Sequence, residues 1–199
     1  MIKEAEELSE IIIKKKIRKL IGIYYSIWAL YSLLVSLGYS ILEELKINNN
    51  LIYIIIPFII IIPFIYYTTK IFRSINLNYI KIIRERRGEN RSNRQIIYIT
   101  IPTVTLTFIF LGYYLGLDII SFIGFYGYVV FIAYVLYRFF YSKYRIIEPR
   151  NYDVMAIITL LLLPLGNVFT FIYIIVEIVW VYASVRSLLE VSEIGEGQD

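Results

Sequence analysis

The chain has 199 residues, 59% of them hydrophobic and 18% charged, with a formal net charge of +4. A soluble domain is nearer half apolar and about a quarter charged, so this composition excludes an ordinary water-soluble globule. Cysteine and histidine are both absent, which excludes disulfide bonds, zinc sites built on these residues and histidine-based acid–base catalysis. The abundance of isoleucine and tyrosine is typical of an AT-rich genome, and we interpret the composition as archaeal or viral-like.

Residues 1–19 are predicted to form an amphipathic helix. Acidic side chains come first and basic side chains last, an order that suits the helix dipole. An apolar stripe runs along the same segment. We expect this helix to lie on the membrane surface or to lead directly into the first span, and a solvated cytoplasmic helix is the alternative.

Residues 20–42 are the first predicted span. Small side chains recur along it at steps of three or four residues, so they share one side of a helix. They are Gly22, Ser26, Ala29 and Ser36. Small residues let helix backbones approach closely in lipid, so we expect this side to pack on another helix of the same chain, with a second copy of the chain as the alternative.

Residues 51–69 are the second predicted span and carry no charge. Their number is close to the roughly 20 apolar residues that a helix needs to cross a hydrocarbon core of about 30 Å. Pro57 and Pro63 each remove a backbone hydrogen bond and predict kinks. A kinked span can mark a moving part or a binding cavity, but we favour plain packing geometry.

Residues 70–95 form the most basic loop, which we expect in the cytoplasm. The arginines that we expect to contact lipid headgroups or an acidic partner are Arg84, Arg86, Arg87, Arg91 and Arg94. No aromatic or groove-reading motif lies among these bases, so nucleic-acid binding is not expected.

Residues 96–115 and 119–137 are the third and fourth predicted spans. Gly112, Gly116 and Gly124 would allow close helix contact here. Aromatic and basic residues gather at the end of the fourth span, as they do at a membrane interface. That end is therefore predicted to return to the cytoplasm.

The last apolar stretch allows two interpretations. Residues 154–185 are too long for one span and slightly short for two, and Pro164 lies within strong turn signals. We favour two short spans, 154–165 and 168–185, followed by a cytoplasmic tail at 187–199. The alternative is a single kinked fifth span that leaves the C-terminus outside.

Glu177 is the one acidic residue clearly inside a predicted span. Polar side chains that would share its side of the last helix form a candidate intramembrane site. The set is Asn167, Thr170, Tyr173 and Glu177. Such an acid would bind a proton or cation during transport, or it would be a neutral acid bonded between helices.

The sequence therefore predicts an all-α, polytopic membrane bundle of six or five transmembrane helices arranged in hairpins. Phosphate-loop, dinucleotide and HExxH zinc motifs are absent, so we expect no enzyme activity, no cofactor and no metal. The expected location is the cell membrane, or the host cell membrane for a viral protein, with the N-terminus in the cytoplasm. The expected partners are the lipid bilayer and either protein subunits or further copies of the chain. A non-catalytic scaffold is the favoured function, and a small transporter or permease subunit using Glu177 is the alternative.

Overall fold

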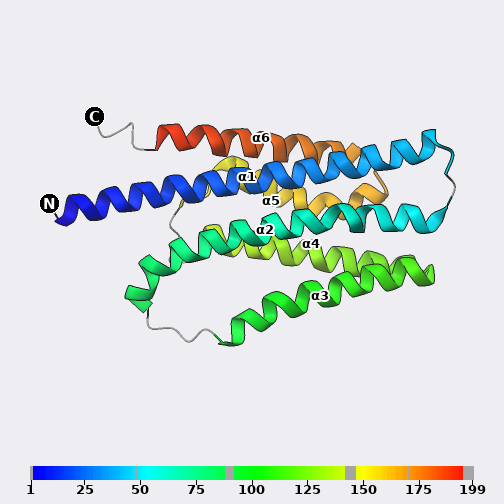
Figure 1. The fold of residues 1–199 in the computed structure, drawn as a ribbon, viewed down its shortest axis with the longest axis horizontal. Coiled ribbons are helices and arrows are strands. Elements are labelled where there is room, and N and C mark those ends of the chain that lie inside the picture. Colours follow the sequence, from blue (N-terminus) through cyan, green and yellow to red (C-terminus); the bar gives the residue numbers. More distant parts are fainter. Residues whose placement is uncertain (1, 48, 88–91, 142–146, 170, 195–199) are drawn as a thin grey trace. The chain divides into compact units, whose positions relative to one another are not determined.

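The computed structural model describes residues 2–47, 49–87, 92–141, 147–169 and 171–194, and all of its regular structure is helical in these ranges. The helices are α1 (Ile2–Glu44), α2 (Asn50–Arg87), α3 (Ser92–Leu115), α4 (Asp118–Tyr141), α5 (Asn151–Leu162), the 3₁₀ helix η1 (Leu163–Asn167) and α6 (Phe171–Glu193) (Figure 1). The prediction of an all-helical chain is confirmed.

Four helical segments within the described ranges are long and apolar enough to cross a membrane. These segments are Leu8–Glu44, Ile55–Ile75, Asp118–Tyr141 and Phe171–Glu193. Large apolar side chains remain exposed along them, with Ile59 of α2 61% exposed and Ile178 of α6 62% exposed. Exposing such an apolar surface to water costs free energy, whereas exposing it to lipid does not. The helices therefore have the composition and length that a membrane protein requires.

The chain divides into two compact units. The terminal unit combines residues Met1–Ile82 with Glu177–Asp199, and the central unit comprises Ile83–Val176. In the terminal unit, α1 and α2 form a hairpin, and the C-terminal part of α6 runs along α1 (Figure 1). In the central unit, α3 and α4 form a second hairpin.

Two helices extend beyond their predicted spans. The amphipathic segment predicted at 1–19 and the span predicted at 20–42 are parts of one continuous helix, α1. Helix α2 likewise continues past the predicted end of its span to Arg87. No proline lies at either boundary, and the single glycine nearby, Gly22, is tolerated within α1.

Helices α1 and α3 end in the same backbone motif. At the end of α1, Ile47 N–H donates to Leu42 O and Lys46 N–H donates to Glu43 O, both at 3.0 Å. At the end of α3, Leu117 N–H donates to Gly112 O at 2.8 Å and Gly116 N–H donates to Tyr113 O at 3.4 Å. This pair of bonds defines a Schellman ending, whose penultimate residue is left-handed. That residue is Lys46 (φ 54°) in the first case and Gly116 (φ 67°) in the second.

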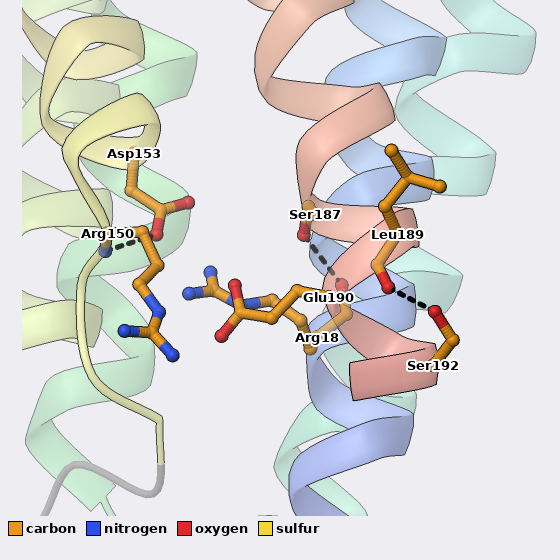
Figure 2. Close-up of polar contacts among 7 residues, drawn as sticks. All are labelled: Arg18, Arg150, Asp153, Ser187, Leu189, Glu190 and Ser192. Atoms are coloured by element: carbon orange, nitrogen blue, oxygen red, sulfur yellow. Dashed lines mark hydrogen bonds and ion pairs between the residues drawn. The ribbon is translucent and has the colours of Figure 1, made fainter. Parts of the chain in front are cut away.

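Helix α5 is short and has a capped beginning. The Arg150 backbone N–H donates to the Asp153 carboxylate at 2.8 Å, and Asp153 is fully buried (Figure 2). This bond pairs a backbone donor that the first turn of a helix leaves open. The 3₁₀ helix η1 follows α5 directly, with Pro164 in its first turn, a position where proline is common.

Candidate functional site

Polar side chains join the first and last helices of the terminal unit. Ser187 Oγ donates to Arg18 O at 3.0 Å, and Ser184 Oγ donates to Gly22 O at 2.9 Å (Figure 2 shows the Ser187 bond). The hydroxyls of Ser26 and Ser184 also bond to each other. We call these contacts, together with Glu190, the α1–α6 interface.

An ion pair lies at one end of the α1–α6 interface. The Arg18 Nε lies 3.0 Å from Glu190 Oε2, and the side chains are 1% and 11% exposed (Figure 2). Taking both charges out of water costs free energy that their attraction only partly returns. Removing one partner would take away this attraction while the other charge keeps its buried position, so loss of a single partner is expected to be destabilising.

Small residues make the α1–α6 contact close enough for these bonds. A Cβ at Gly22 would lie 2.9 Å from Leu188 Cγ and 3.3 Å from Ser187 Cβ. Ala29, one heptad after Gly22, is buried as well. Serine hydroxyls can reach a carbonyl on the facing helix only when the backbones approach in this way.

An aromatic layer continues the same unit. The Tyr25 and Trp180 ring centroids lie 5.5 Å apart, which joins α1 to α6. The Tyr24 and Phe72 centroids lie 5.3 Å apart, which joins α1 to α2. Edge-to-face contacts of this kind contribute about 0.5–1.5 kcal/mol beyond their buried area.

A tyrosine pairs a carbonyl that a proline leaves open. Pro57 has no N–H, so the carbonyl four residues earlier, on Tyr53, loses its helical partner. Tyr39 of α1 donates its hydroxyl to Tyr53 O at 3.3 Å, and the Tyr39 and Tyr53 rings stack with centroids 5.7 Å apart. Lipid offers no alternative partner for that carbonyl, so α1 supplies the donor.

The candidate site predicted around Glu177 is only partly described. Glu177 is half-buried on α6, and no hydrogen bond or ion pair joins it to another described residue. The ring of Tyr173 packs on Gly166, where an added Cβ would lie 2.6 Å from Tyr173 Cζ. Thr170 and the side chain of Asn167 lie outside the described residues. The structure thus gives the four residues no common set of contacts.

The glycines predicted to mediate packing differ in their surroundings. An added Cβ at Gly112 would lie 2.3 Å from Ser121 N, and one at Gly124 would lie 2.7 Å from Ile109 N, so both occupy the α3–α4 contact. Gly116 has open space around it and instead forms the left-handed residue that ends α3. Ser36 on α1 is exposed.

The structure describes the predicted prolines but not the side chains of the predicted arginines. Pro57 and Pro63 lie inside α2, and Pro164 lies in η1. Arg91 lies outside the described residues, as do the side chains of Arg84, Arg86, Arg87 and Arg94. Sequence reasoning missed Arg18 and Glu190 as partners, because each stands in a stretch of charges next to a span. The signal that would have found them is their spacing from Gly22 and Ser187 along the two small-residue sides.

Comparison with protein-family models, with curated proteins and with solved structures found no match to this chain. Within the described ranges, no group of three or more histidine, cysteine or acidic residues is arranged to hold a metal ion.

Proposed function

We propose that the chain crosses the membrane six times. Besides the four long apolar segments, the segments Thr100–Leu115 and Asn151–Gly166 are shorter apolar helices. The 12 residues of α5 and the 5 residues of η1 together rise about 28 Å, because a 3₁₀ helix advances further per residue than an α-helix. That length is close to the hydrocarbon thickness of about 30 Å, which supports a fifth crossing before α6.

Both ends of the chain are proposed to face the cytoplasm. The beginning of α1 and the end of α6 lie at the same end of the terminal unit (Figure 1). Basic residues crowd positions 14–19 and 70–95, whereas the proposed outer turn between α1 and α2 carries only Lys46. An excess of lysine and arginine is typical of cytoplasmic loops.

Within this membrane, the function that we propose is a non-catalytic scaffold or partner subunit. The observation that carries this proposal is the use made of hydroxyl groups in the spans. Serine and threonine hydroxyls along the described helices donate to a backbone carbonyl of their own or a facing helix, among them those of Ser40, Thr69, Thr105, Thr107, Ser121, Thr159, Ser184 and Ser187. Hydroxyl groups bonded in this way support helix structure and packing, which a scaffold needs. This use favours a scaffold over a protein whose hydroxyls line a polar path for a solute.

A test of the scaffold uses the exposed side of α1. A bulky change, Ser36→Phe, should reduce the size of the complex that the chain forms in native lipid particles, as measured by mass spectrometry. The control Leu37→Phe alters a neighbouring exposed residue that is already large. Retained helix content in both variants, together with an unchanged complex in Ser36→Phe, would argue against assembly through this side.

Glu177 favours a second candidate, a small transporter or permease subunit. An ionisable side chain at membrane depth is costly, and evolution keeps it mainly for ion or proton pathways. If Glu177 carries such a pathway, the purified chain in liposomes should move protons or cations down a gradient, and Glu177→Gln should abolish that flux. Equal flux through both proteins, or none through either, would remove this candidate.

A further inference from the structure

Two buried polar atoms of the terminal unit have no hydrogen-bond partner among the described residues. They are Trp28 Nε1 on α1 and Thr68 Oγ1 on α2. An unpaired buried donor is rare because it loses its hydration without a replacement, and in lipid there is no bulk water to supply one. Each atom therefore requires a hydrogen-bond partner other than the described side chains and backbone groups.

The two atoms lie at the same level of the α1–α2 hairpin. Tyr24 pairs with Phe72, with ring centroids 5.3 Å apart, and Tyr31 pairs with Phe64 at 5.4 Å. Trp28 lies one turn after Tyr24, and Thr68 lies one turn before Phe72. Because the two helices run in opposite directions, these steps bring Trp28 and Thr68 to matching positions.

The Thr68 hydroxyl also departs from the usual behaviour of threonine in an apolar helix. Thr69, Thr105 and Thr107 each donate to the carbonyl four residues earlier, at 2.8, 2.9 and 2.8 Å. Such a bond is the usual way to satisfy a hydroxyl in an apolar helix. Thr68 makes no bond of this kind to a described residue, although its neighbour Thr69 does.

Glu177, on α6, lies at the same height along the terminal unit as Trp28 and Thr68. Along the α1–α6 interface, Ser187 bonds to Arg18, and the Trp180 ring meets Tyr25. One further turn back along α6 leads to Glu177, and one further turn along α1 leads to Trp28. Glu177 also stands seven residues before Ser184, so it shares the side of α6 that faces α1.

We propose that Trp28, Thr68 and Glu177 form one hydrogen-bonded polar site inside the terminal unit, bridged by a bound water molecule. The indole N–H is a donor only, the hydroxyl both donates and accepts, and the carboxyl group supplies acceptors. A buried water needs two to four such partners, and three helices provide them here. The indole N–H can only donate, so it needs an acceptor such as a water oxygen and cannot itself ligate a metal cation. The proposal does not depend on the scaffold function, and it names the group that a transporter would use.

The first test follows Trp28 by its fluorescence. The chain has two tryptophans, so Trp180→Phe leaves Trp28 as the sole emitter and keeps an aromatic ring at position 180. In that background, Thr68→Val should shift the emission to shorter wavelength, because water and a dipole beside the indole are lost. Thr69→Val is the matched control and should leave the emission unchanged, and Thr68→Ser should preserve it. Identical spectra for Thr68→Val and Thr69→Val would overturn the site.

A second test asks whether α2 and α6 are coupled. Thr68→Val and Glu177→Leu should lower the unfolding midpoint by less together than the sum of their separate effects, because either change already disrupts the network. Thr69→Val combined with Glu177→Leu should be additive. Additive effects in both pairs would contradict a shared network.

A third measurement needs no substitution within the site. The Raman marker of indole hydrogen bonding, recorded on Trp28 in the Trp180→Phe chain, should report a bonded N–H. A free N–H would overturn the proposal even if the Thr68 variants failed to fold.

Discussion

At the scale of single residues, the terminal unit depends on polar groups whose partners lie on another helix. Arg18 is almost fully buried yet charged, and it lies 3.0 Å from Glu190 across the α1–α6 interface. Tyr39 donates to a carbonyl that Pro57 leaves open on α2. Each contact can be removed by a single substitution, so its contribution can be measured.

Removing one partner of the ion pair should destabilise the protein strongly. Arg18→Met removes the guanidinium from beside the buried Glu190 carboxylate, and we expect a loss of about 3 kcal/mol in the free energy of unfolding. The double change Arg18→Met with Glu190→Leu should recover much of that loss, because no charge then remains buried. Denaturant-induced unfolding in lipid or detergent measures both.

The exposed pair Lys14–Glu10 provides the control. These side chains are 3.0 Å apart and 39% and 58% exposed, so Glu10→Gln should cost less than about 0.5 kcal/mol. If Arg18→Met cost no more than Glu10→Gln, the Arg18–Glu190 pair would not fix the two helices.

The bond between Tyr39 and Tyr53 should matter only while position 57 is proline. Tyr39→Phe keeps the stacked ring but leaves the Tyr53 carbonyl unpaired, so we expect a loss of about 1 kcal/mol in the wild-type background. In a Pro57→Ala background, the restored N–H of residue 57 can bond to Tyr53 O, and Tyr39→Phe should then be nearly neutral. A double-mutant cycle of unfolding free energies measures this coupling, and equal costs in both backgrounds would contradict the assignment.

At the scale of elements, the ends of α1 and α3 are the same structure built from different residues. Both helices close with a Schellman motif, but the left-handed position is Lys46 in one and Gly116 in the other. A side chain in this conformation costs about 1 kcal/mol, because its Cβ approaches the following carbonyl oxygen. Glycine avoids that cost.

Opposite changes at these two positions should have opposite effects. Lys46→Gly should raise the free energy of unfolding by about 0.5–1 kcal/mol, because it relieves the left-handed backbone at the end of α1. Gly116→Ala should lower it by a similar amount, although the space around Gly116 is open and no clash arises. Thermal unfolding of the two variants checks both signs, and a destabilising Lys46→Gly would show that the lysine side chain has another role.

The same elements explain what the sequence could and could not predict. Periodicity and composition were enough to predict helices, because lipid requires long uninterrupted apolar runs. Among the small residues, Gly22 and Gly112 do lie at close helix contacts, whereas Gly116 ends a helix. The spacing of glycines in the sequence cannot distinguish a glycine at a helix contact from a glycine that ends a helix. The spacing of Arg18 from Gly22 and of Glu190 from Ser187 indicates the side of each helix on which they lie, but their pairing also depends on the register of two helices far apart in the sequence.

At the scale of the whole molecule, the number of crossings decides where the C-terminus lies. Two crossings in the last third of the chain require η1 to reach the outer surface, so that α6 can return. Val168, immediately after η1, is 70% exposed and would stand at that outer turn. A single kinked crossing would place the same residue at membrane depth, facing lipid, and leave the end of α6 outside.

Because the chain contains no cysteine, single-cysteine labelling can test this arrangement without background. A membrane-impermeant maleimide added to intact cells should label Lys46→Cys, Leu117→Cys and Val168→Cys, which lie in the three proposed outer turns. A cysteine at Ser192, near the end of α6, should react only after the membrane is permeabilised. Protection of Val168→Cys together with labelling of Ser192→Cys in intact cells would instead establish five crossings. In that arrangement the last helix would run toward the outside, and the beginning of α1 and the end of α6 would face opposite sides. The Arg18–Glu190 pair joins these two helices, so the labelling result must also agree with the effect of Arg18→Met.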